Sequence, residues 1–193
     1  GWDTAEELHA LQDIEFSPEI IILSYFPNDI VSVANRMGFN FDWQYITPQN
    51  PLWTWLVNNS YFANYLHFST TLGVRNKETY SQFIAYLLEC HQNPQIGQEH
   101  QNELRTIAKI CSDKGARLVV VSWPLFSLPR ESALMNKYLE DALKDFSCEI
   151  IVMEKEIGDW PLEKLIVSNK DPHPSKTVHM FTADLLEQQI SKY

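Results

Sequence analysis

Three short runs of residues along the chain are apolar at consecutive positions. They cover residues 19–25, 117–123 and 148–153. A strand of a parallel sheet is covered on both faces and therefore shows such a continuous run. Between the runs, apolar residues recur at helical spacing over 98–114 and over 131–145. This alternation of strand and helix predicts an α/β fold, with a parallel sheet and crossover helices.

Helical patterns also occur near the two ends of the chain. Residues 4–15 carry Ala, Leu and Ile at helical spacing behind Thr4, a residue type that caps helices. Near the other end, an amphipathic helix follows Ser175, which we expect to be its N-terminal cap. With 193 residues and 45% hydrophobic composition, the chain can bury a substantial core. We therefore predict a single domain over residues 1–193.

The stretch 40–95 departs from this alternation. Its pattern predicts a helical insertion, with one aromatic amphipathic helix over 51–72 and another over 77–91. The simplest interpretation is that most of its aromatic residues fill the core. A lid or acyl-binding wall is a sharper alternative; a membrane-surface helix is a weaker one, because 51–72 lacks the Lys/Arg face typical of such helices. The aromatic residues concerned are Trp43, Trp53, Trp55, Tyr61, Phe62, Tyr65 and Phe68.

Charge and cysteine content exclude several classes of protein. The 15 basic and 25 acidic residues give a net charge of −10, with no basic stripe that could release counterions from nucleic acid. No apolar run is long enough for a transmembrane helix. Cys90, Cys111 and Cys148 indicate neither a disulfide framework nor a metal motif. The first residues are acidic and not signal-like, and we expect the natural N-terminus upstream of Gly1, which leaves the compartment open.

Two residues with complementary chemistry, Asp171 and His173, precede the last helix. A carboxylate close to an imidazole can hold the ring in one tautomer while the ring takes a proton from a nucleophile. Taken alone, Asp-x-His before a helix is more often surface capping. A metal site built from Asp171, His173 and His179 is another alternative, although no recognised ligand spacing supports it.

A second candidate segment follows the apolar run 19–25, where Asn28 and Asp29 come just after the strand. Asn-Asp at this place is typical of a turn. In combination, however, three segments in chain order resemble the sequence blocks of the SGNH (GDSL-like) hydrolases. They are Gly1-Trp2-Asp3-Thr4, the strand with Asn28-Asp29, and Asp171-Pro172-His173-Pro174-Ser175 with His179.

The resemblance implies a three-layer α/β/α sandwich with a parallel, flavodoxin-like sheet and a site at the carboxyl ends of the strands. It implies that Asp171 orients His173 and that His173 is the catalytic base. The side chain of Asn28 and the backbone N–H of Gly1 would form the oxyanion hole, each donor contributing roughly 3 kcal/mol. The family mechanism requires no metal and no organic cofactor.

Three features depart from the family pattern. Phe26 stands where the family usually has Gly, and Lys170 stands where it usually has Asp, so Asp171 lies one residue closer to His173. The Gly-Asp-Ser block that carries the nucleophile does not occur in the chain. We therefore expect the first strand or strands and the nucleophile upstream of Gly1. An interior strand edge would then be exposed, and we expect the chain alone to self-associate through it.

Serines within the chain are weaker candidates for the nucleophile. Ser24 lies in one predicted strand and Ser122 ends another, whereas Ser175 fits better as a helix cap. Gly158-Asp159-Trp160 has Trp at the nucleophile position, and we interpret it as a loop.

Two hypotheses from different classes follow. In the first, the chain is the C-terminal portion of an SGNH-type ester hydrolase, a lipase, acylesterase or acetylesterase that acts on a small-molecule, carbohydrate or lipid ester. In the second, the protein has no nucleophilic serine, and the domain is a non-catalytic module that binds a ligand or partner on the same scaffold.

Overall fold

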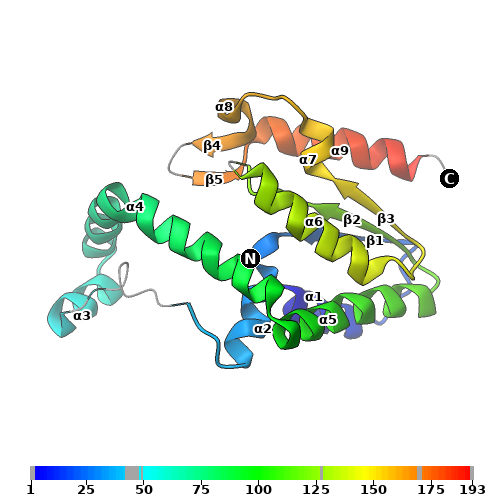
Figure 1. Ribbon diagram of the computed structural model, residues 1–193, viewed down its shortest axis with the longest axis horizontal. Coiled ribbons are helices and arrows are strands. Elements are labelled where there is room, and N and C mark those ends of the chain that lie inside the picture. Colours follow the sequence, from blue (N-terminus) through cyan, green and yellow to red (C-terminus); the bar gives the residue numbers. More distant parts are fainter. Residues whose placement is uncertain (1–2, 42–47, 49, 127, 169–170, 192–193) are drawn as a thin grey trace.

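A parallel sheet of three strands forms the core of the protein (Figure 1). The computed structural model describes residues 3–41, 48, 50–126, 128–168 and 171–191, with the backbone alone for 71–79 and 129. The strands are β1 (Ile20–Tyr25), β2 (Arg117–Ser122) and β3 (Cys148–Val152), in the order β1-β2-β3. Tyr25 pairs with Ser122, and Ser122 with Val152, so the three carboxyl ends lie at one edge. The three predicted strands are confirmed.

One face of this sheet is covered by α1 (Thr4–Gln12), α5 (Pro94–Asp113) and α6 (Pro129–Leu143). Successive side chains of a strand point to opposite faces, so only every second residue of each strand contacts these helices. The turn after α5 contains Gly115 at a φ of 69°, a conformation that favours glycine. The core on this face includes Leu23, Leu104, Leu118, Val120 and Leu139.

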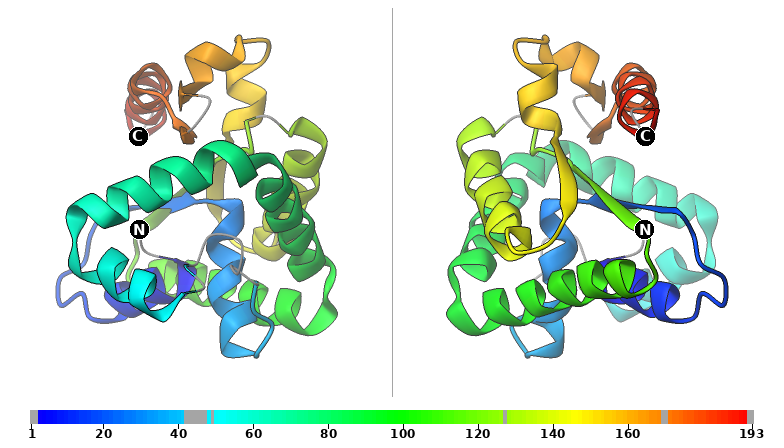
Figure 2. Two further views of the ribbon diagram at one scale, coloured as in Figure 1. Left: turned by 90° about the vertical axis from the view of Figure 1, so that its left-hand side faces the viewer. Right: turned by 90° about the vertical axis from the view of Figure 1, so that its right-hand side faces the viewer.

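The opposite face is covered by α7 (Met153–Ile157), α8 (Leu162–Leu165) and α9 (Lys176–Ile190), as Figure 2 also shows. Val119 and Val121 of β2 pack there in one buried cluster with Val178 of α9. Helices therefore lie on both faces of a parallel sheet, which confirms the predicted α/β class.

The insertion predicted over 40–95 is helical, but its helices have other bounds. After α2 (Ile30–Arg36) come α3 (Pro51–Asn59) and α4 (Tyr61–Gln92). The break falls at Ser60, whose hydroxyl accepts a hydrogen bond from the N–H of Ala63 and caps α4. The predicted break between 72 and 77 is wrong, because the backbone of α4 continues through it.

Four of the seven aromatic residues named from the sequence pattern do not fill the core. Trp55, Tyr61, Phe62 and Tyr65 are exposed, which contradicts the simplest interpretation of their pattern. Trp53 and Phe68 are partly buried, and Trp43 lies outside the described residues. The reason is the position of α3, which packs on α4 and not on the sheet (Figure 1).

The cap of α1 is Asp3, and the prediction of Thr4 as the cap is wrong. The Asp3 carboxylate accepts hydrogen bonds from the N–H groups of Ala5 and Glu6, and the Glu6 carboxylate accepts one from Asp3 N–H. Thr4 is buried instead, with its hydroxyl 3.1 Å from Nε2 of His100. Because the Thr4 hydroxyl pairs with His100 in the core, the Asp3 carboxylate caps the helix instead.

Candidate functional site

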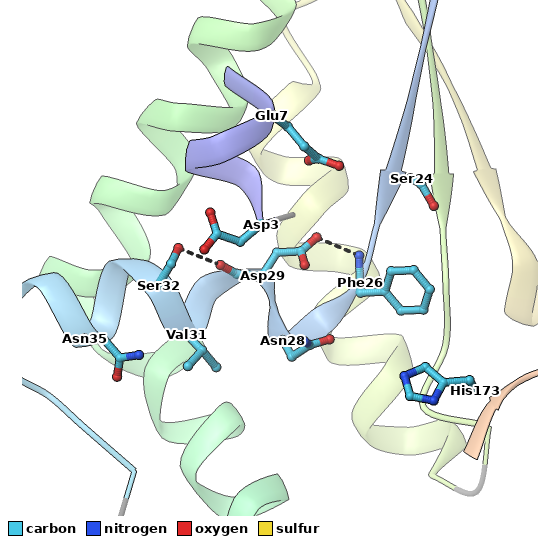
Figure 3. A pocket seen from close by; sticks show the side chains of 10 residues that line it. All are labelled: Asp3, Glu7, Ser24, Phe26, Asn28, Asp29, Val31, Ser32, Asn35 and His173. Atoms are coloured by element: carbon cyan, nitrogen blue, oxygen red, sulfur yellow. Dashed lines mark hydrogen bonds between the residues drawn. The ribbon is translucent and has the colours of Figure 1, made fainter. Parts of the chain in front are cut away.

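A cavity of about 600 Å³ lies beside the carboxyl end of β1 (Figure 3). Binding sites in open parallel sheets are typically found at this edge. Figure 3 shows Asn28 and His173 facing the same hollow although they come from distant parts of the chain. The cavity is lined by Asp3, Glu7, Ser24, Phe26, Asn28, Asp29, Val31, Ser32, Asn35 and His173.

His173 lies on a short antiparallel hairpin of β4 (Ile166–Ser168) and β5 (Asp171–Pro174). The hairpin was missed in the sequence because β5 is four residues long and contains two prolines. It leads directly into α9, which Ser175 caps as predicted by accepting a hydrogen bond from Val178 N–H. The imidazole is thus held where the chain passes from a strand into a capped helix.

Asp171 and His173 form a close hydrogen-bonded pair. His173 Nδ1 lies 2.6 Å from Asp171 Oδ1, and the same oxygen accepts a bond from His173 N–H at 3.1 Å. The side-chain hydrogen bond with His173 holds the pKa of Asp171 below its usual range, and the backbone bond adds to this effect. His173 Nε2 has no hydrogen-bond partner among the described residues, and the side chain is 76% exposed. The pair therefore has one ring nitrogen oriented by a carboxylate and one available for proton transfer.

Asn28 lies in η1 (Pro27–Asp29), the 3₁₀ turn that follows β1. The turn is fixed by Asp29, whose Oδ2 accepts a hydrogen bond from Phe26 N–H at 2.8 Å. Asn28 itself is exposed, and its carboxamide makes no hydrogen bond to any described residue. Its amide donors are therefore available to an oxyanion in the cavity.

Two carboxyl groups of the cavity are protonated more easily than is usual. Burial raises the pKa of Asp29 to about 8; the hydrogen bond from Phe26 N–H opposes this shift, and the nearby charges of Glu7 and Asp3 add smaller contributions to it. Burial, followed by the charge of Asp3, raises the pKa of Glu7 to about 7. Glu7 Oε2 is buried without a hydrogen-bond partner in the described part of the chain. Sequence reasoning missed Glu7, although its position one helical turn before the buried Leu11 places it on the inward face of α1.

The serines considered as nucleophiles have different surroundings. Ser24 lines the cavity, and its hydroxyl accepts a hydrogen bond from Trp123 Nε1 at 2.8 Å. Ser122 is buried, and its hydroxyl donates to Asn136 Oδ1 at 2.7 Å. Ser24 is thus the one of these two that reaches the cavity. Gly158-Asp159-Trp160 is a loop, as predicted.

Phe26 has a packing role in this protein. Its ring stacks on that of Trp123 with centroids 5.5 Å apart and planes 14° apart. The ring of His179 meets that of Trp123 edge-on, with ring centroids 5.4 Å apart. A glycine at position 26 would leave the Trp123 ring without this stacking partner.

The metal site considered from Asp171, His173 and His179 does not form. No group of three His, Cys, Asp or Glu side chains in the described part of the chain is placed to hold a metal ion. Gly1, expected to contribute to the oxyanion hole, lies outside the described residues.

Comparisons of the chain with protein-family models, with curated proteins and with solved structures found no match.

Proposed function

We propose that this chain is the part of an SGNH-type ester hydrolase that carries the base and the oxyanion donors, with the nucleophilic serine supplied from a segment upstream of Gly1. The observation that supports this proposal most is the shared cavity of Asn28 and His173 at the carboxyl end of β1. An oxyanion donor and an imidazole paired with a carboxylate are the two components that acyl transfer requires besides the nucleophile.

In the proposed reaction, His173 Nε2 takes the proton of the serine hydroxyl as the serine oxygen bonds to the ester carbonyl carbon. Asp171 keeps the imidazole oriented through Nδ1 and stabilises the imidazolium. The Asn28 amide and the Gly1 N–H donate to the carbonyl oxygen as it becomes negative. The bond to the alcohol then breaks, and the alcohol leaves with the proton from His173. Water next attacks the acyl carbon while His173 takes its proton, and the acid leaves as the serine oxygen takes that proton back.

The finer architecture of the SGNH family, a three-layer flavodoxin-like sandwich with further strands, belongs to the same proposal. It is supported by the edge of β1, which pairs with β2 and with no other described strand. Ile22, in the middle of β1, is 47% exposed although it lies in an apolar run typical of an interior strand, so the sheet face next to this edge is incompletely covered. A strand from the upstream segment would cover this edge. In the chain alone, the edge offers a place for pairing with a second copy.

The test is fluorophosphonate labelling and ester turnover with the protein expressed from its complete gene. His173→Ala should lower turnover of p-nitrophenyl acetate by about 10⁴-fold or more and prevent labelling, because the base is lost. His9→Ala, which removes an exposed histidine of α1, is the matched control and should retain full activity.

Peptide mass spectrometry then locates the nucleophile. A label on a serine upstream of Gly1 supports the proposal. A label on Ser24 that is absent in Ser24→Ala would contradict an upstream nucleophile and assign that role to Ser24, which lines the cavity. Complete lack of labelling and turnover in folded protein would overturn the esterase proposal in favour of a non-catalytic binding domain.

A further inference from the structure

A hairpin of two helices stands apart from the sheet and its covering layers. We call residues 51–70, which comprise α3 and the first part of α4, the aromatic arm. Figure 1 shows the arm projecting beyond the body of the protein, and α3 packs on α4. In the arm, α3 and α4 therefore pack mainly on each other, and their remaining sides form its surface.

The two helices of the arm are held together by a small inner face. Val57 of α3 and Ala63 of α4 are buried. Nε1 of Trp53 donates a hydrogen bond to Nδ1 of His67 at 3.1 Å, and the two rings meet edge-on. These residues define the sides of α3 and α4 that face each other.

Large apolar side chains cover the outer sides of both helices. On α3, Leu52 and Trp55 are 68% and 60% exposed and lie on the side away from the Trp53–Val57 face. On α4, the exposed large apolar residues share the side away from Ala63 and His67. They are Tyr61 (98%), Phe62 (74%), Tyr65 (70%) and Leu66 (42%). Large apolar side chains thus lie on two opposite sides of the arm, which a single flat protein surface cannot cover at once.

The charge distribution points to the kind of surface that can cover both sides. Residues 43–74 contain no Asp, Glu, Lys or Arg, so the whole net charge of −10 belongs to the rest of the chain. Tyr and Trp are favoured at the boundary between lipid and water, where the ring is buried and its polar group stays hydrated. Without Lys or Arg, the arm has no attraction to anionic lipids, and the acidic body is repelled by them.

We propose that the aromatic arm docks this protein on a lipid surface of zwitterionic headgroups, with both helices lying in the interfacial region. Insertion at the interface lets lipid surround the outer sides of α3 and α4 together. Within the described residues, no helix combines the length and apolar character needed to span a bilayer, so the docking is peripheral. The proposal goes beyond the esterase function and does not depend on it.

The experiment is flotation of the purified protein, expressed from its complete gene, with phosphatidylcholine vesicles, and with vesicles that contain increasing phosphatidylglycerol. We expect the protein to float with pure phosphatidylcholine and to bind less as the anionic fraction rises. The triple variant Trp55→Ser, Phe62→Ser, Tyr65→Ser should lower the partition coefficient at least about tenfold, since each change removes a buried apolar group from the interface.

The matched control changes three apolar residues of similar exposure outside the arm, Leu134, Val167 and Met180, to serine. This control should bind phosphatidylcholine as the unmodified protein does, and circular dichroism checks that both variants are folded. Three results would each overturn the proposal: no binding to phosphatidylcholine, binding that rises with phosphatidylglycerol, or equal binding by both triple variants. Sedimentation of the arm variant as a smaller species than the unmodified protein, without vesicle binding by either, would assign the arm to contacts between copies. Since no ester turnover is measured, these results are separate from the test of the esterase proposal.

Discussion

Trp123 and Trp55 place the same side chain in two contrasting regions of the molecule. Trp123 follows β2 at the carboxyl edge of the sheet, is 4% exposed and stacks on Phe26. Trp55 lies on the aromatic arm and is 60% exposed. The first is enclosed because helices cover both faces of the sheet, whereas the second lies on a hairpin that projects from those layers. Burial of an aromatic residue here depends on the layer that contains it.

The sharpest contrast between the two regions comes from truncating the two tryptophans. Trp123→Ala should lower the free energy of unfolding by about 3–5 kcal/mol, because it leaves a cavity beside Phe26. Trp55→Ala should change it by less than about 0.5 kcal/mol, because the side chain is largely in water. Urea unfolding of the 193-residue chain measures both. Similar losses in the two variants would mean that the arm is packed as tightly as the sheet.

The dependence of stability on pH should come from the body of the protein, where Asp29 and Glu7 lie, and not from the aromatic arm. The pKa of Asp29 is about 8 in the folded protein against an ordinary value of 3.8, so the folded state keeps a proton that the unfolded state releases. The free energy of unfolding should therefore fall as the pH rises from about 4 to 8, by up to about 1.4 kcal/mol per pH unit for this group. Glu7, raised to about 7, acts in the same direction.

Asp29→Asn tests this origin of the pH dependence, because the amide oxygen can still accept the Phe26 N–H bond. Urea unfolding at pH 5, 6.5 and 8 should show a clearly flatter decline in the variant. Asp184→Asn, an exposed position on α9, is the control and should keep the slope of the unmodified protein. An unchanged slope in Asp29→Asn would contradict the assignment.

Two asparagine caps provide the smallest effect. Asn93 caps α5 by accepting hydrogen bonds from the N–H groups of Gln95 and Ile96, and Asn50 caps α3 by accepting one from Trp53. Asn93→Ala should lower the global free energy of unfolding by about 1 kcal/mol, because α5 packs on the sheet. Asn50→Ala should instead speed hydrogen exchange within α3 and leave global unfolding nearly unchanged, because the arm can open separately. A global loss in Asn50→Ala would show that the arm and the body unfold together.

The strands and crossover helices could be predicted because each is specified locally. Continuous apolar runs marked β1, β2 and β3, and helical spacing marked α5 and α6. The cap of α9 at Ser175 was also predictable, since its hydroxyl accepts a hydrogen bond from the N–H of Val178, only three residues further along the chain. The bounds of α3 and α4 were not, because Ser60 is one of several polar residues along that aromatic stretch.

The candidate site was predictable in its residues but not in its surroundings. The pattern of Asp171, His173 and Asn28 could be found from spacing and order along the chain. The raised pKa values of Glu7 and Asp29, which also line the cavity, could not be predicted, because they depend on burial and on charges brought close by folding.

The sequence by itself determined which segments form the sheet, which form its covering helices, and where an Asp–His pair and an Asn stand relative to them. Periodicity and capping are local properties, so they are written in neighbouring residues. Only the tertiary structure decided that Asn28 and His173 line one cavity, that Thr4 pairs with His100, and that the aromatic arm is left uncovered. Each of these depends on how distant segments pack, which no short stretch of the chain specifies.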